Sequence, residues 1–178
     1  LSQRGEKGEK FKIDLWSCAP LGPEVDGRLA EVGLLNRRLA HQANPALAKA
    51  INKGEVHYAD MGAAWVPLEV RKGSLGKLNL AVIEAVEITN DGFVVPTLCV
   101  GDEATFLRYA DNVIVEINVN LPLELSGIHD IYIPDSPPKR KPIPINSVTD
   151  RIGTPYIEVD PEKIRGVIIS DKKTSPPA

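Results

Sequence analysis

The sequence KLNLAVIEAVEITNDGFVVPTLCVGDEATFLRYADNVIVEINVN at residues 77–120 decides the fold. Two apolar runs, residues 78–83 and 93–100, lie on either side of an Asn-Asp-Gly triplet at 90–92. Because these residue types tolerate the positive φ angles of tight turns, the two runs are predicted to pair as a hairpin. The first run is almost entirely apolar, which is typical of a strand buried on both faces.

A short helix and a third strand are predicted after the hairpin. Residues 101–110 carry two acidic side chains in the first turn, where the helix dipole favours negative charge, and residues 113–120 are again rich in β-branched side chains. Strand, helix and strand at this spacing form a parallel crossover unit, and ligands of such units bind beyond the carboxyl ends of the strands. Six residues lie at or just past the ends of the apolar runs: Glu84, Gly101, Asp102, Glu103, Asn118 and Asn120. This geometry alone assigns them no function. Four of them are the residues that we predict to border a substrate: Gly101, Asp102, Glu103 and Asn118.

These four positions also have plain structural explanations. Asp102 and Glu103 are typical charges of a helix start, and polarity at the edge of a strand ladder explains Asn118 equally well. Glu84 follows the first apolar run and could act as a nucleophile toward an acyl group, but a paired or hydrogen-bonded structural role is favoured. The sequence alone leaves both readings open.

The remaining patterns predict an α/β protein with an open, mainly parallel sheet and helices on both faces. Residues 11–17 and 166–170 have strand patterns, and residues 24–33, 46–53 and 63–71 have helical ones. Asn44 and Pro45 supply an N-cap and a first-turn proline for the second of these helices. Residues 34–43 fit neither pattern clearly.

The predicted organisation is a single domain over residues 11–170, preceded by a polar lead-in at 1–10 and followed by a frayed tail at 171–178. Five prolines within residues 134–144 cannot support a strand ladder, so an extended, proline-rich surface arm is expected there.

Composition argues against several function classes. The chain has 21 basic and 24 acidic residues, a formal net charge of −3, and no long block of one sign, so nucleic acid is not an expected partner. No apolar run reaches the ~20 residues of a membrane helix, so we expect a cytoplasmic protein with no membrane partner. Cys18 and Cys99 lie in apolar surroundings and are expected to be buried, reduced thiols.

Common catalytic motifs are absent from the sequence. There is no phosphate-binding loop, dinucleotide fingerprint, zinc-protease motif or nucleophile elbow. The three histidines are scattered without a second metal-type residue at ligand spacing, so no metal is expected. His129 is expected to be a structural histidine satisfied by backbone.

Several separated blocks resemble the amino-terminal domain of the acetyl-CoA hydrolase/transferase family, which includes acetate and succinate CoA transferases. The resemblance spans roughly residues 8–170, and the blocks are FKIDLWSCAPLGPEVDGRLA (11–30), KLNLAVIEAVEITNDGFVVPTLCVG (77–101), ADNVIVEIN (110–118), GIHDIYIP (127–134) and DRIGTPYI (150–157). Family members often read Gly-Asn-Ser where this chain has Gly101, Asp102 and Glu103. Two added negative charges near a carboxylate or a CoA phosphate would be unfavourable if they were desolvated.

The resemblance implies two related α/β domains that handle coenzyme A thioesters in the cleft between them. In that family a glutamate of the carboxyl-terminal domain attacks the acyl-CoA, and a glutamyl-CoA intermediate then passes CoA to a second carboxylate. Coenzyme A is therefore expected as a substrate, with an acyl-CoA such as acetyl-CoA and a carboxylate such as succinate or acetate. No residue of this chain matches the family's nucleophile, so no catalytic residue is expected within it.

Other functions remain open at this point. Water as the final acceptor would make the enzyme an acetyl-CoA hydrolase. A non-catalytic domain that binds a small acid or phosphate is the alternative from a different class. Expected protein partners are the carboxyl-terminal catalytic domain or a separate catalytic chain, and a homodimer is compatible with the sequence.

Overall fold

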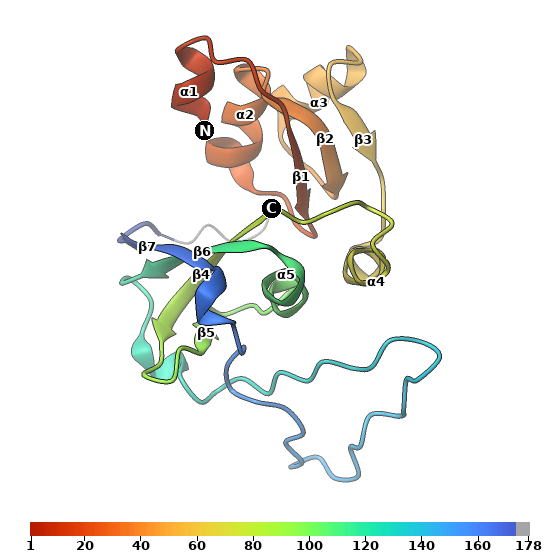
Figure 1. Cartoon of the computed structure of the whole chain (residues 1–178), viewed down its shortest axis with the longest axis vertical. Coiled ribbons are helices and arrows are strands. Elements are labelled where there is room, and N and C mark those ends of the chain that lie inside the picture. The colour runs from red at the N-terminus through yellow and green to blue at the C-terminus, as the bar shows by residue number, and fades with distance from the viewer. Residues whose placement is uncertain (174–178) are drawn as a thin grey trace. The chain divides into compact units, whose positions relative to one another are not determined.

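The computed structural model describes residues 1–173, which gather into two compact units, Leu1–Val66 and Pro67–Lys173 (Figure 1). Each unit contains its own sheet and its own hydrophobic core. The α/β class with mainly parallel strands is confirmed, with the strands divided between two sheets. The single domain predicted over residues 11–170 stays a prediction, and part of the predicted frayed tail, residues 174–178, lies outside the described residues.

The first unit holds a three-stranded parallel sheet in the order β1-β2-β3. Its strands are β1 (Ile13–Ser17), β2 (Leu35–Ala40) and β3 (His57–Ala59). Its helices are α1 (Ser2–Glu6), a π-helical turn (Pro23–Gly27) that continues into α2 (Arg28–Glu31), α3 (Pro45–Asn52), a 3-10 turn (Ala63–Trp65) and the first residue of α4 (Val66–Lys72). The short α1 within the polar lead-in was not predicted, and the ambiguous segment 34–43 contains β2.

Helix α3 forms where the sequence predicts it. The Asn44 side chain accepts hydrogen bonds from the backbone N–H groups of Ala46 (2.9 Å) and Leu47 (3.2 Å), which satisfies donors that the helix itself cannot. Pro45 occupies the first turn, where its missing N–H costs nothing. The fully buried Leu47 then packs in the core between α3, α2 and the sheet. The local capping signals and the burial of Leu47 therefore both favour a helix at these residues.

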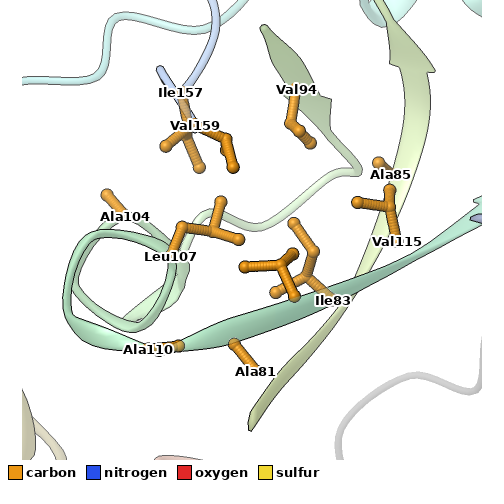
Figure 2. Close-up of a cluster of buried hydrophobic side chains, with 11 residues drawn as sticks. Ala81, Ile83, Ala85, Val94, Ala104, Leu107, Ala110, Val115, Ile157 and Val159 are labelled. Carbon is orange, nitrogen blue, oxygen red and sulfur yellow. The ribbon is translucent and has the colours of Figure 1, made fainter. Parts of the chain in front are cut away.

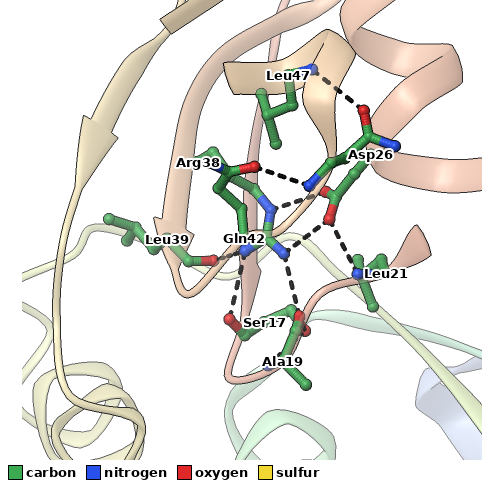
Figure 3. Close-up of polar contacts among 9 residues, drawn as sticks. Ser17, Ala19, Leu21, Asp26, Arg38, Leu39, Gln42 and Leu47 are labelled. Carbon is green, nitrogen blue, oxygen red and sulfur yellow. Dashed lines mark hydrogen bonds and ion pairs between the residues drawn. The ribbon is translucent and has the colours of Figure 1, made fainter. Parts of the chain in front are cut away.

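A buried ion pair joins strand β2 to the π-helical turn (Figure 3). The side chains of Arg38 on β2 and Asp26 in the π-helical turn are both 0% exposed, and Arg38 Nε donates to Asp26 Oδ1 at 2.8 Å. A second contact joins Arg38 Nη2 to Asp26 Oδ2 at 3.2 Å, and that oxygen also accepts from the backbone N–H of Leu21 at 2.9 Å. Because a buried charge is tolerated only when it is paired and hydrogen-bonded, this network holds the loop after β1 against β2.

The second unit is built on a four-stranded sheet in the order β5-β4-β6-β7. It comprises the rest of α4 (to Lys72), β4 (Leu80–Ile88), β5 (Val94–Pro96), α5 (Glu103–Tyr109), β6 (Asn112–Asn118) and β7 (Ile164–Ser170), with 3-10 turns at Leu123–Leu125 and Pro161–Lys163. Strand β4 pairs antiparallel with β5 and parallel with β6, and β6 pairs parallel with β7. The predicted hairpin and the predicted parallel crossover are both confirmed.

Helix α5 packs on one face of this sheet (Figure 2). Alternate residues of β4 and β6 point into the shared core, which contains Ala81, Ile83, Ala85, Val113 and Val115 together with Ala104 and Leu107 of α5. Strand side chains alternate between faces, so the intervening residues lie on the other face of the sheet. Glu84, Glu116 and Asn118 belong to this second set.

Two expectations about burial are wrong. Strand β4 is not buried on both faces, because Leu80 is 43% exposed and Val82 is 58% exposed. Cys99, which follows the short edge strand β5, is exposed, and Cys18 is only partly buried, so neither thiol is buried as expected. The two cysteines form no disulfide, as expected. An apolar run does not by itself distinguish burial on one face from burial on two.

The proline-rich segment behaves as predicted. Residues 134–144 contain no helix or strand and are almost entirely exposed. Pro96, in contrast, is accommodated in β5 because this strand lies at the edge of its sheet. No helix within residues 1–173 combines the length and apolar character that crossing a bilayer requires.

Candidate carboxylate site

Glu84 connects the residues that the sequence singles out in the second unit. It lies in the middle of β4, directly opposite Glu116 of β6. Asn118 follows Glu116 by two positions, so its side chain is on the same face of the sheet. The Asn118 amide Nδ2 donates to Glu84 Oε1 at 2.6 Å, so Glu84 is hydrogen-bonded, as the favoured structural interpretation expects.

Asn118 is held on several sides. It is 1% exposed, and its Nδ2 also donates to the carbonyl of Lys172 at 2.8 Å, just beyond the end of β7. Its Oδ1 accepts from the backbone N–H of Asn120 at 3.0 Å. An amide nitrogen has two hydrogens to donate. With both engaged, Asn118 fixes the position of the Glu84 carboxylate rather than presenting a spare donor.

The turn into α5 places two more carboxyl groups near Glu84. Gly101 adopts φ +49°, a left-handed conformation that L side chains rarely adopt, and the chain then enters the helix. Burial raises the pKa of Asp102 to about 6. Burial raises the pKa of Glu103 to about 8, and the negative charges of Glu84 and Asp102 act in the same direction.

The Glu103 carboxyl is therefore protonated at neutral pH. Its Oε2 atom is buried and has no hydrogen-bond partner among residues 1–173. A neutral carboxylic acid can donate one hydrogen bond, for example to a carboxylate or a carbonyl oxygen. The site thus combines a buried proton donor with a carboxylate that an asparagine holds in place.

The four residues predicted to border a substrate are brought together only in part. Asp102 and Glu103 interact electrostatically with each other, and Glu103 with Glu84, which in turn is bonded to Asn118. Gly101 is exposed in the turn beside them, with open space where a Cβ would lie. Glu84 was set aside as structural, and its part in connecting the others was missed. The sequence signal for this role is that Glu84 lies on a strand predicted to pair with the strand that carries Asn118.

Other sequence candidates lie outside this cluster. The His129 ring nitrogen Nε2 lies 3.3 Å from the carbonyl oxygen of Pro96, a backbone contact that fits the structural role expected of it. Within the described part of the chain, no three His, Cys, Asp or Glu side chains are grouped so that they could hold a metal ion.

Comparison with known proteins relates the chain to enzymes of coenzyme A metabolism. Residues 1–169 match the model of the acetyl-CoA hydrolase/transferase N-terminal domain. The chain is 41% identical over 170 residues to the succinyl-CoA:acetate CoA-transferase of Clostridium kluyveri, an alignment that covers 94% of this chain and 32% of that protein.

Two fungal proteins are also similar. The acetyl-CoA hydrolases of Schizosaccharomyces pombe and Neurospora crassa are 35% and 36% identical, with 91% and 94% of this chain covered. The alignments cover 32% and 33% of those proteins. The chain therefore spans about a third of the length of the curated relatives that it matches.

Proposed function

Because the chain belongs to the acetyl-CoA hydrolase/transferase family, we propose that it is the amino-terminal domain of a CoA transferase that moves CoA from an acyl-CoA to a carboxylate. Acetyl-CoA is the proposed donor, and succinate or acetate the proposed acceptor. The observation that carries the choice of transfer over hydrolysis is the 41% identity to a succinyl-CoA:acetate CoA-transferase, against 35% and 36% for the two hydrolases.

In this proposal the nucleophile belongs to a second, carboxyl-terminal domain. A glutamate there attacks the acyl-CoA, and the resulting glutamyl-CoA thioester passes CoA to the acceptor carboxylate. Such a relay divides one difficult exchange into easier steps and keeps the free energy of the thioester. The present chain contributes residues that border the substrates.

The carboxylate site is the proposed substrate contact. Gly101, Asp102 and Glu103 border the ligand, and the protonated Glu103 donates a hydrogen bond to a carboxylate or thioester oxygen. Asn118 keeps Glu84 in place beside them. A neutral Glu103 also removes one of the negative charges that would otherwise repel an acidic substrate.

Exposed apolar side chains support a protein partner. Val82 on β4 and Ile168 on β7 are 58% and 51% exposed, and the strand register places both on the sheet face that carries Glu84 and Glu116. Apolar side chains gathered on a sheet are typical of a surface that packs against further polypeptide. We propose the carboxyl-terminal catalytic domain, or a separate catalytic chain, as that partner.

Thermal unfolding in the presence of ligands tests the proposal. We expect CoA to raise the midpoint, since binding at 100 times Kd adds about 2.7 kcal/mol to the free energy of unfolding. Acetate and sugar phosphates at the same concentration should raise it much less. The 178-residue chain alone should exchange no CoA between acetyl-CoA and succinate. Equal stabilisation by sugar phosphates would instead support a phosphate-binding domain without transferase function, and exchange by the chain alone would contradict the proposed location of the nucleophile.

A further inference from the structure

A polar cavity lies in the second unit, and neither Glu84 nor Asn118 lines it. It has a volume of about 110 Å³ and lies between the end of α4, helix α5 and the first residues of the proline-rich arm. A single ordered water requires only ~10–15 Å³ on the same measure, so the cavity has room for a small polyatomic group. Its polar lining comes from Arg71, Thr105, Arg108, Tyr109, Asp135 and Ser136.

The two arginines of this cavity lack a carboxylate partner. Neither Arg71 nor Arg108 forms an ion pair with any residue in 1–173, whereas Arg38 and three other arginines of the first unit each do. Arg71 is only partly exposed, and its two bonds go to neutral acceptors, the Pro134 carbonyl at 3.1 Å and the Thr105 hydroxyl at 3.2 Å. A guanidinium has five N–H donors, so donors remain for a ligand.

Neighbouring groups add to this positive, donor-rich character. The Thr105 hydroxyl accepts from Arg71 and keeps its own hydrogen available, and Ser136 adds a second hydroxyl. Arg140 donates from Nε to the backbone carbonyl of the lining residue Asp135 at 3.3 Å, which adds a third guanidinium next to the lining. Asp135 is the only acidic residue of the lining, so the cationic side chains outnumber it.

We propose that this cavity is an oxyanion site that binds a phosphate group, either inorganic phosphate or the phosphomonoester end of a larger ligand. Guanidinium groups match phosphate in planar, bidentate geometry, and hydroxyls can complete the shell of a tetrahedral anion. An anion here would supply the counter-charge that the protein does not provide to Arg71. The site stands on the cavity and its arginines and does not depend on the transferase activity proposed above.

Calorimetric titration of the whole chain with inorganic phosphate, at ionic strength held constant with chloride, tests the site. Arg108→Glu reverses one charge at an exposed position whose side chain forms no hydrogen bond or ion pair with other described residues, so the fold should be retained. We expect this variant to raise the Kd for phosphate about tenfold or more, because charge-assisted hydrogen bonds are lost. Arg71→Lys keeps the charge but loses the fork geometry and should weaken binding by a smaller factor.

Lys7→Glu is the matched control. It makes the same change in net charge at an exposed lysine of the first unit and should leave the Kd unchanged. A non-specific effect of phosphate as a salt would not depend on which residue is replaced, so it would be the same in all variants. No phosphate binding by the native chain, or an equal Kd in Arg108→Glu and Lys7→Glu, would overturn the proposal.

Coenzyme A and 3′-dephospho-CoA identify the source of the phosphate. Tighter binding of CoA, with the difference abolished by Arg108→Glu, would support the site and assign it the 3′-phosphate of CoA. Equal binding of both, together with Arg108-dependent binding of inorganic phosphate, would support the site with a different phosphorylated ligand. Failure of CoA binding alone would contradict the proposed function and leave the phosphate site supported.

Discussion

Replacing Asp26 by Asn should destabilise the first unit more than any exposed charge replacement in that unit. The carboxylate of Asp26 and the guanidinium of Arg38 are both fully buried and joined by two contacts of 2.8 and 3.2 Å. Asparagine has nearly the same shape but leaves the buried guanidinium without a counter-charge. Removing one partner of such a pair costs about 3–5 kcal/mol.

Both tryptophans of the chain, Trp16 and Trp65, lie in the first unit, so urea unfolding followed by their fluorescence measures the stability of that unit. With a slope of ~1–3 kcal/mol per molar urea, the loss corresponds to a midpoint lowered by at least about 1 M. Asp14→Asn is the matched control, because it breaks the partly exposed Asp14–Arg37 pair in the same sheet. Its expected cost is only ~0–1 kcal/mol.

A double variant separates the orphaned charge from the lost contacts. Asp26→Leu combined with Arg38→Met replaces the ion pair by apolar side chains, and such replacements are often neutral or stabilising. We expect it to be more stable than Asp26→Asn alone. If Asp26→Asn shifts the urea midpoint no more than Asp14→Asn does, the buried pair does not support this unit as described.

Three further predictions concern the second unit. The Glu103 pKa of about 8 in the folded protein exceeds its ordinary value of 4.5. Between these two pH values the folded state retains a proton that the unfolded state loses. The free energy of unfolding should therefore fall as pH rises from about 4.5 to 8. Glu103→Gln should flatten that slope in urea titrations followed by circular dichroism, and exposed Glu162→Gln should not. Gly153→Ala should cost several kcal/mol, since its Cβ would lie 2.2 Å from a backbone oxygen, whereas Gly166→Ala has open space and should cost under about 1 kcal/mol. Asn118→Ala should cost about 1–3 kcal/mol, because it removes a buried hydrogen-bond partner of Glu84.

These three predictions have clear contrary outcomes. An unchanged pH slope in Glu103→Gln would mean that a different group carries the pH dependence. Equal melting temperatures for the two glycine variants would contradict the close backbone approach at residue 153. A neutral Asn118→Ala would show that Glu84 does not depend on that bond.

Much of the fold could be predicted from local patterns. Two local motifs depend only on adjacent residues, and both are found as expected. They are the Asn-Asp-Gly turn at 90–92 and the helix cap formed by Asn44 and Pro45. The parallel crossover from β4 to β6 followed from the spacing of apolar runs. In these places local preference and tertiary structure agree.

Features set by distant parts of the chain could not be predicted. The segment containing Arg37 and Arg38 was ambiguous because Arg38 is buried only through its pairing with Asp26, which lies twelve positions earlier. The polar cavity proposed to bind phosphate unites Arg71, Arg108 and the start of the arm, and no spacing rule connects them. The raised pKa of Glu103 likewise depends on burial and on Glu84 from another strand.

The most direct test of the central claim is a chimeric enzyme. The corresponding third of the Clostridium kluyveri succinyl-CoA:acetate CoA-transferase would be replaced by residues 1–173 of this chain, and CoA transfer from succinyl-CoA to acetate would be measured. We expect a folded chimera that transfers CoA, with Glu103→Gln lowering the rate and Glu162→Gln leaving it unchanged. A chimera that is folded and binds CoA but transfers none would contradict the assignment of this chain to CoA transfer.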